Sequence, residues 1–255
     1  MQALARSWPP LASLAAAAAL WEAVGRLHLS IIVPPLSDVL ATWLSMLRAG
    51  EVTGDLATSL LELGIGFGAA LALALVIGVA MGRYGAVDTM LAPYVNAFLV
   101  APTSALVPVL ALLFGLGSAP IVVAVFMFAF FPMVINFSAG IRAAPGVLQE
   151  MARAYGANEA QILRRIVIPA ALPLMLTGVR LGMARAIKGL IIGEILIAVV
   201  GIGGRIETYG NSFELEPLYA LLLTIVAIAV ALTSALRLVQ RGVAPWYFSA
   251  TEERE

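Results

Sequence analysis

Residues 150–173 read EMARAYGANEAQILRRIVIPAALP and place a charged, glycine-centred and proline-ended insert in an otherwise apolar chain. Of the 255 residues, 62% are hydrophobic and 12% are charged. Soluble domains are about 45–50% apolar and about 25% charged, so this chain lacks the polar residues needed to cover a surface in water. The composition predicts a membrane protein in which the insert lies outside the lipid.

Six segments are long and apolar enough to cross a bilayer, which takes a helix of about 20 residues. They cover about 9–27, 59–81, 91–114, 119–140, 172–200 and 217–237. The first is the weakest, because its apolar run ends at Trp21 and Glu22 follows; with Arg6 upstream it also fits a cleaved signal peptide. The sequence thus predicts an all-α polytopic membrane protein with about six transmembrane helices, in one domain over residues 1–255.

Arginine positions predict the orientation of these spans. If the N-terminus lies in the cytoplasm, three arginines lie outside, Arg26, Arg48 and Arg205, and nine lie inside, which is a positive-inside bias. The nine are Arg6, Arg83, Arg142, Arg153, Arg164, Arg165, Arg237, Arg241 and Arg254. Both termini and the loop at 142–170, which contains the insert, are then cytoplasmic. On the outer side, the segment after Ser37 is expected to form either an interfacial helix capped by Ser37 or an ordered loop.

Several kinds of chemistry are excluded or disfavoured by composition. The chain has no cysteine and one histidine, His28, which leaves no thiolate or histidine-based metal site. Its net charge of zero gives no general attraction to nucleic acid. There is no G-x-x-x-x-G-K-[ST] phosphate loop, no HExxH, no G-x-S-x-G and no evident pair of carboxylates, so neither an ATPase nor an intramembrane enzyme is expected.

The small residues of the second span predict close helix packing. These are Gly66, Ala70, Ala74, Gly78 and Gly82.

The insert has the pattern of a short amphipathic helix. On a single helix, one apolar stripe would contain Met151, Tyr155, Ile162 and Ile166. Gly156 would cost about 1 kcal/mol relative to alanine inside that helix. Either a turn or the close approach of another backbone is therefore expected there, and neither leaves space for a side chain. Pro169 and Pro173 are expected to end the segment, because proline has no N–H to donate. A plain surface loop remains the alternative, although about 30 residues is long for a connector.

The spacing of this insert resembles the EAA loop of binding-protein-dependent ABC importer permeases, E-A-A, three residues, G, nine residues, I-x-L-P. Here the motif is Glu150-Met151-Ala152, Gly156 and Ile166-x-Ile168-Pro169, with mild departures at Met151 and Ile168. VPPLSDVL (33–40), RLGMARAIKGLIIGEIL (180–196) and GIGGRI (201–206) are similar to the nitrate, sulfonate and taurine subgroup. VAPTSALVP (100–108) lacks the Arg-Pro pattern expected for that subgroup.

The resemblance implies a permease subunit in a bacterial inner membrane. It would pair with a second copy of itself and with two ABC ATP-binding subunits, which use the ATP, so that this chain itself binds no cofactor. A periplasmic or lipid-anchored binding protein would deliver a small organic or inorganic anion such as a sulfonate, taurine or nitrate. The insert would be the coupling helix that contacts the ATPase. Its expected contact residues are Glu150, Met151, Ala152, Arg153, Tyr155, Gly156, Ile166 and Pro169.

Charges inside the fifth span form a second candidate site. Charged side chains at membrane depth usually face a protein interior or a water-filled path. Arg185, Lys188 and Glu194 therefore form either a structural ion-pair group or part of a translocation path that favours anions. Glu194 would either orient Lys188 or contact another helix, whereas Glu62 is expected at the interface. Candidate polar lining from the third and fourth spans comprises Asn96, Thr103, Ser104 and Asn136.

A secondary transporter or channel that needs no ATPase is the alternative function. Such proteins show inverted repeats and interrupted helices. The two halves of this sequence have no convincing repeat, so the importer permease is favoured.

Overall fold

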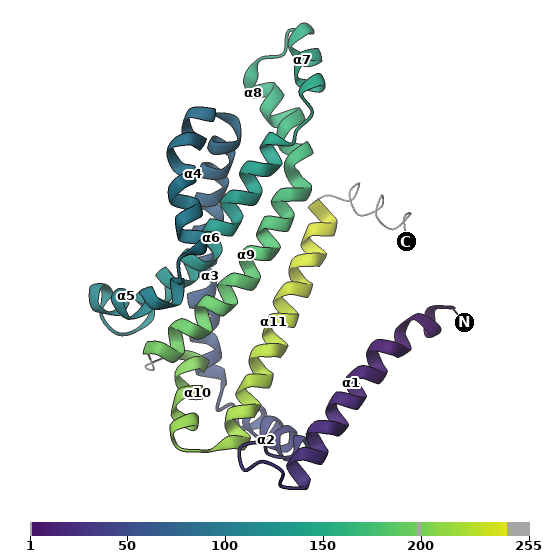
Figure 1. Cartoon of the computed structure of the whole chain (residues 1–255), viewed down its shortest axis with the longest axis vertical. Coiled ribbons are helices and arrows are strands. Elements are labelled where there is room, and N and C mark those ends of the chain that lie inside the picture. The colour runs from purple at the N-terminus through teal and green to yellow at the C-terminus, as the bar shows by residue number, and fades with distance from the viewer. Residues whose placement is uncertain (1, 198–199, 244–255) are drawn as a thin grey trace.

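The computed structural model describes residues 2–197 and 200–243, which are largely helical and contain no strand. Three long helices form the centre of the molecule and pack side by side (Figure 1). They are α3 (Thr53–Arg83), α6 (Ser118–Arg142) and α9 (Ile168–Ile197). Helix α11 (Leu215–Val243) runs beside α9. The all-α fold class is therefore confirmed.

Glycines allow α3 and α6 to approach closely. A Cβ added at Gly78 would lie 2.6 Å from the Cβ of Phe137, and one added at Gly82 would lie 2.5 Å from the Cβ of Ile141. Both distances are shorter than a carbon–carbon contact, so each site accepts only a hydrogen. The predicted small-residue stripe is thus a packing surface, as expected.

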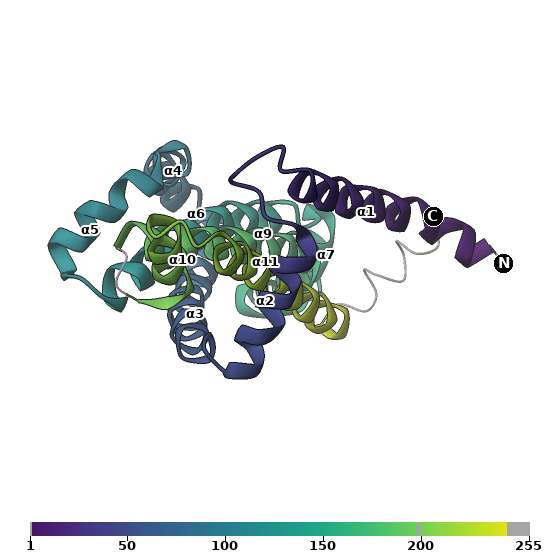
Figure 2. The same ribbon diagram turned by 90° about the horizontal axis from the view of Figure 1, so that it is seen from below.

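Four helical stretches of the described chain are long and apolar enough to cross a membrane. They are 53–83, 118–142, 159–197 and 215–240, and they coincide with four of the expected spans. The span expected at 9–27 lies on α1 (Gln2–Arg26), which is not among them. Figures 1 and 2 show α1 leaning away from the central helices. A fifth span is reached only if a bent helix pair is included.

That bent pair occupies the span expected at 91–114, which is not one straight helix. Helix α4 (Gly85–Val100) is followed by the 3-10 turn η1 (Thr103–Leu106) and α5 (Val107–Phe114), and the two parts meet at 90°. The break falls at Ala101 and Pro102. Ala101 has an extended backbone, φ −58° and ψ 141°, because the ring of a following proline disfavours the helical region.

Helix α2 (Leu36–Ala49) lies across the end of the bundle opposite to α7 (Gly146–Ala154). The expectation that Ser37 caps α2 is wrong, because the helix already begins at Leu36. Instead, the Ser37 N–H donates to the Glu22 carboxylate at 2.9 Å. A carboxylate from α1 thus satisfies a free amide in the first turn of α2.

Candidate functional site

The insert forms two short helices that project from one end of the bundle (Figure 1). Helix α7 ends at Ala154, and α8 spans Glu159–Ile162. Between them, Gly156 has φ +82°, a left-handed conformation that glycine adopts without strain. The expected turn at Gly156 is confirmed, but a Cβ there would meet nothing within 4 Å. The backbone angle, and not a lack of space within the chain, therefore selects glycine.

Helix α8 continues into α9 without ending at the prolines. Asn158 and Gln161 form a capping box, in which each side chain accepts the other's backbone N–H at 2.9 Å. The π-helical turn η2 (Leu163–Val167) follows and includes an N–H of Ile168 bonded to the carbonyl of Leu163. The prediction that Pro169 and Pro173 end the segment is wrong. The wider turn just before Pro169 provides the local adjustment that a proline in a helix requires.

The expected apolar stripe is divided between the two short helices. Met151 is 51% exposed and Tyr155 is 86% exposed, so these two side chains project from the molecule. Ile162 is only 1% exposed and packs inside. A single-helix stripe is therefore wrong, since the turn at Gly156 rotates α8 relative to α7. The exposed part of the stripe is an apolar surface on α7.

One hollow beside the turn collects several of the predicted coupling residues. Its volume is about 470 Å³, and its lining includes Ala152, Tyr155, Gly156 and Ile166. Of the remaining predicted residues, Glu150 is exposed and Pro169 is half-buried within the continuous helix. The structure thus brings together residues from both ends of the sequence motif around one surface.

Ion pairs connect the insert to the body of the molecule. Glu159 accepts hydrogen bonds from Arg153 at the end of α7 and from Arg83 at the end of α3. Arg142, at the end of α6, pairs with Asp88 of α4 at 2.8 Å. Sequence reasoning did not assign Arg83 or Glu159 a role, because their approach depends on the turn at Gly156. Glu159 thus joins α7 and α8 to the end of α3.

The predicted path residues are only partly brought together. Arg185 and Thr103 line one small pocket of about 20 Å³ together with Pro132. Asn136 lies one turn beyond and donates to the carbonyl of Pro132 at 2.8 Å. Lys188 is exposed on the surface of α9 in the single chain. Asn96, which is exposed, and Ser104, which is half-buried, do not line this pocket.

Glu194 is buried between helices of the chain. It is 0% exposed, accepts a hydrogen bond from the Ser59 hydroxyl of α3, and accepts the Gly203 N–H at 2.8 Å. Of the two expected arrangements, the contact with another helix is therefore the observed one. Glu62 is 2% exposed, so its side chain lies inside the protein and does not reach its surface. Its place on the inner face of α3 brings it towards Glu194, a carboxylate pair that the sequence did not indicate.

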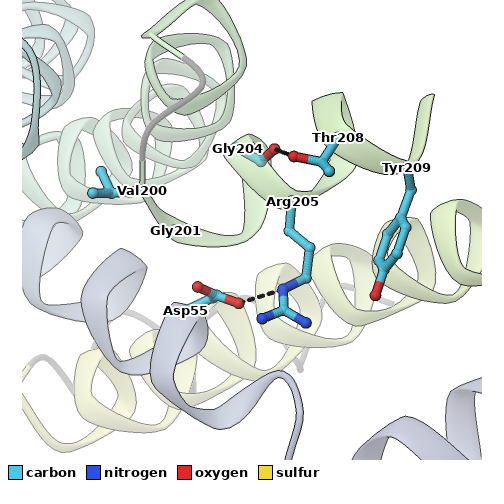
Figure 3. Close-up of a pocket in the computed structure, with 7 residues that line it drawn as sticks. All are labelled: Asp55, Val200, Gly201, Gly204, Arg205, Thr208 and Tyr209. Carbon is cyan, nitrogen blue, oxygen red and sulfur yellow. Dashed lines mark hydrogen bonds and ion pairs between the residues drawn. The ribbon is translucent and has the colours of Figure 1, made fainter. Parts of the chain in front are cut away.

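Another pocket lies at the opposite end from α7, under α10 (Gly201–Asn211) (Figure 3). It measures about 330 Å³, and its lining includes an ion pair of 2.5 Å between Arg205 and Asp55. Partial burial lowers the pKa of Arg205, but Asp55 and Tyr209 outweigh it and hold that pKa above its ordinary value. The cation is thus permanent, and Asp55 neutralises it.

An all-α bundle with several helices long and apolar enough to cross a membrane, and with a short amphipathic helix projecting from one end, defines a polytopic membrane protein. Residues 64–247 match the family described as the inner membrane component of binding-protein-dependent transport systems. The match covers most of the chain, so the chain belongs to this family.

Relatives in this family have related functions. The chain is 28% identical over 244 residues to the taurine transport system permease protein TauC of Escherichia coli, covering 93% of this chain and 89% of TauC. It is 27% identical over 230 residues to SsuC of Bacillus subtilis, which is named for aliphatic sulfonates transport. This match covers 89% of this chain and 83% of SsuC. The chain is thus an inner-membrane permease component of an ABC importer, and a secondary transporter without an ATPase is not supported.

The fold is also that of a solved importer. An inward-facing structure of the MetNI methionine ABC transporter superimposes with a TM-score of 0.65 at 18% identity, covering 75% of this chain and 95% of the matched chain. At this identity the match supports the fold alone, and it agrees with the helical bundle observed here.

Proposed function

We propose that this permease imports a small anion, sulfonates first, as one of two identical subunits that work with two ATP-binding subunits and a separate binding protein. The observation that carries this proposal is α7, which holds Met151 and Tyr155 away from the bundle on an ordered turn. An exposed apolar helix face with charged flanks is suited to a groove on a partner protein.

The coupling contact follows from the chemistry of this surface. Met151 and Tyr155 are the apolar anchors, while Arg153 and Glu150 at the edge supply orientation. Gly156 sets the angle between α7 and α8, and Ile166 and Pro169 join the contact to the long helix α9. ATP-driven movement of the partner would then tilt α9 through the continuous helix that begins at Glu159.

The orientation proposed for the chain follows the arginine distribution. The α7 end lies in the cytoplasm, where the ATP-binding subunits are, and both chain termini lie on that side. The α10 end faces outward, where the binding protein arrives. A second copy completes the wall of the path, because a few packed spans from one chain do not surround a pore.

The anionic solute is supported by residues and by relatives. TauC and SsuC are named for taurine and sulfonates. In this chain, Arg185 lines a pocket with Thr103, and Lys188 follows on the exposed surface of α9. Cations at this depth lower the barrier for an anion that must leave water.

The test is uptake into proteoliposomes that contain the permease, its ATP-binding subunit and its binding protein. Ethanesulfonate and the uncharged ethanesulfonamide differ mainly in charge, so they form a matched pair. We expect ATP-dependent uptake of ethanesulfonate alone. Uptake of the neutral compound or of a cation in preference would contradict the anion assignment, and failure to co-purify an ATP-binding subunit would contradict the coupling assignment.

A further inference from the structure

The N-terminus of α10 is capped by side chains from two other helices. The residue before α10, Val200, offers no side-chain cap. Instead, the Ile202 N–H donates to the Ser59 hydroxyl at 3.0 Å, and the Gly203 N–H donates to Glu194 at 2.8 Å. The Ser59 hydroxyl in turn donates to Glu194. These contacts satisfy amides that every helix leaves free in its first turn.

Two glycines make this approach feasible. Gly201 has φ +75°, and a Cβ there would overlap the Glu194 carboxylate. A Cβ at Gly203 would lie 2.5 Å from the Glu194 Cβ. The backbone of α10 therefore sits directly against the Glu194 side chain. Free amides and the positive end of the helix dipole both stabilise a negative charge, so a carboxylate at Glu194 has hydrogen-bond donors for its oxygens although it is buried.

Glu62 has the opposite environment. It lies one turn beyond Ser59 on α3 and is 2% exposed. Within the described part of the chain, neither of its carboxyl oxygens has a hydrogen-bond partner. It nevertheless lies close enough to Glu194 for the two carboxyl groups to interact. A second buried carboxylate here would lose its hydration and would repel Glu194.

In the part of the chain that the structure describes, the elements packed against this pair supply no cation. On α10, Arg205 is paired with Asp55 of α3. On α9, Arg185 lines a separate pocket and Lys188 lies on the exposed surface. The N-terminus of α6 contributes Ser118, which is neutral. Among the described residues, no ion pair includes either Glu62 or Glu194.

We propose that Glu62 and Glu194 form a binding site for one proton, with Glu62 as the neutral acid and Glu194 as the carboxylate. One proton removes the repulsion and gives Glu62 an O–H that can donate to Glu194. It therefore allows the ionised Glu194 to keep the N-terminus of α10 seated against α3 and α9. This site does not depend on which solute the importer carries.

The test is infrared spectroscopy of the purified transporter in lipid nanodiscs at neutral pH. The wild type should have a protonated-carboxyl C=O band that shifts in heavy water. Glu62→Gln should abolish it, and Glu62→Met serves the same purpose if the first variant does not assemble. Glu214→Gln, at an exposed position, is the matched control and should leave the band unchanged.

Three results would overturn the proposal. One is the absence of the band in the wild type. Another is a band that survives Glu62→Gln but is lost in Glu194→Gln, because the neutral acid would then be Glu194. The third is a band present in choline chloride and lost in sodium chloride, because the occupant would then be a metal cation bound by the same oxygens.

Discussion

Arg153 donates to Glu159 at 2.8 Å across the turn at Gly156 and so joins the end of α7 to the beginning of α8. Arg83 approaches the same carboxylate from the end of α3. The proposed coupling role of α7 requires a fixed angle between this helix and the body of the protein, and the Glu159 carboxylate contacts both parts. Loss of these contacts should therefore affect coupling to the ATP-binding subunit more than the stability of the fold.

Replacing Glu159 should weaken coupling more than folding. Ion pairs on exposed surfaces contribute about 0–1 kcal/mol to stability, and Glu159 is 57% exposed in its side chain. We therefore expect Glu159→Gln to leave the melting temperature nearly unchanged while it reduces solute-stimulated ATP hydrolysis. Glu51→Gln, at an exposed position between α2 and α3 and away from the proposed coupling surface, is the control for loss of one negative charge. A melting temperature that falls in proportion to activity would show that the contact only stabilises the fold.

Substitution of Gly156 should act through its backbone angle. A non-glycine residue in the left-handed region costs roughly 1–2 kcal/mol, and asparagine tolerates it better than alanine. Gly156→Ala should therefore weaken association with the ATP-binding subunit, whereas Gly156→Asn should retain most of it. Gly146→Ala, where φ is ordinary and nothing lies within 4 Å of an added Cβ, is the control. Co-purification and uptake measure the effect, and equal behaviour of the alanine and asparagine variants would argue against a strained angle.

The glycines of α3 provide a test of the packing. Gly78→Val would place a side chain against Phe137 and should destabilise the protein by about 1–3 kcal/mol. Gly68→Val makes the same change on the same helix, where an added Cβ meets nothing within 4 Å. Thermal unfolding in detergent should separate the two variants. Comparable melting temperatures would mean that α3 and α6 can move apart at little cost.

Topology can be measured directly because the sequence has no cysteine. Single cysteines at Ala157 and Asn211 should react differently with a membrane-impermeant thiol reagent added to intact cells. Asn211→Cys should be labelled from outside, and Ala157→Cys only after lysis. Tyr155→Cys, at an 86% exposed position beside the turn, controls for burial of Ala157. Labelling of either inner-side cysteine in intact cells would reverse the proposed orientation.

The features set by local sequence were the most predictable. Long apolar runs gave α3, α6, α9 and α11, because any such run in lipid must form a helix to satisfy its backbone. The turn at Gly156 followed from glycine in a polar segment. The sequence also contains a signal for the bend at Pro102, because a residue that precedes proline avoids helical backbone angles.

Features set by contacts between distant segments were not predictable. Glu62 and Glu194 were each assigned from depth along their own span, which says nothing about which face meets another helix. Their meeting depends on the close approach of α10, which the glycines at 201 and 203 allow. Similarly, local sequence disfavours a continuous helix through Pro169, because proline has no N–H to donate. The π turn that accommodates this proline depends on the hydrogen bond between Leu163 and Ile168.

Arg185 and Lys188 of α9 should determine the sign of the charge that is transported. If Arg185 and Lys188 lower the barrier for an anion, neutral replacements should slow uptake without affecting assembly. We expect Arg185→Met and Lys188→Met each to reduce ethanesulfonate uptake at least about tenfold, equivalent to about 1.4 kcal/mol. Arg48→Met, on α2 and away from the central helices, removes the same charge and should transport normally. Expression and association with the ATP-binding subunit are measured in parallel. Normal uptake by both variants, or a binding protein that prefers a cation, would exclude an anion path along α9. The family assignment would survive either result, because it depends on residues 64–247 as a whole and not on two cations.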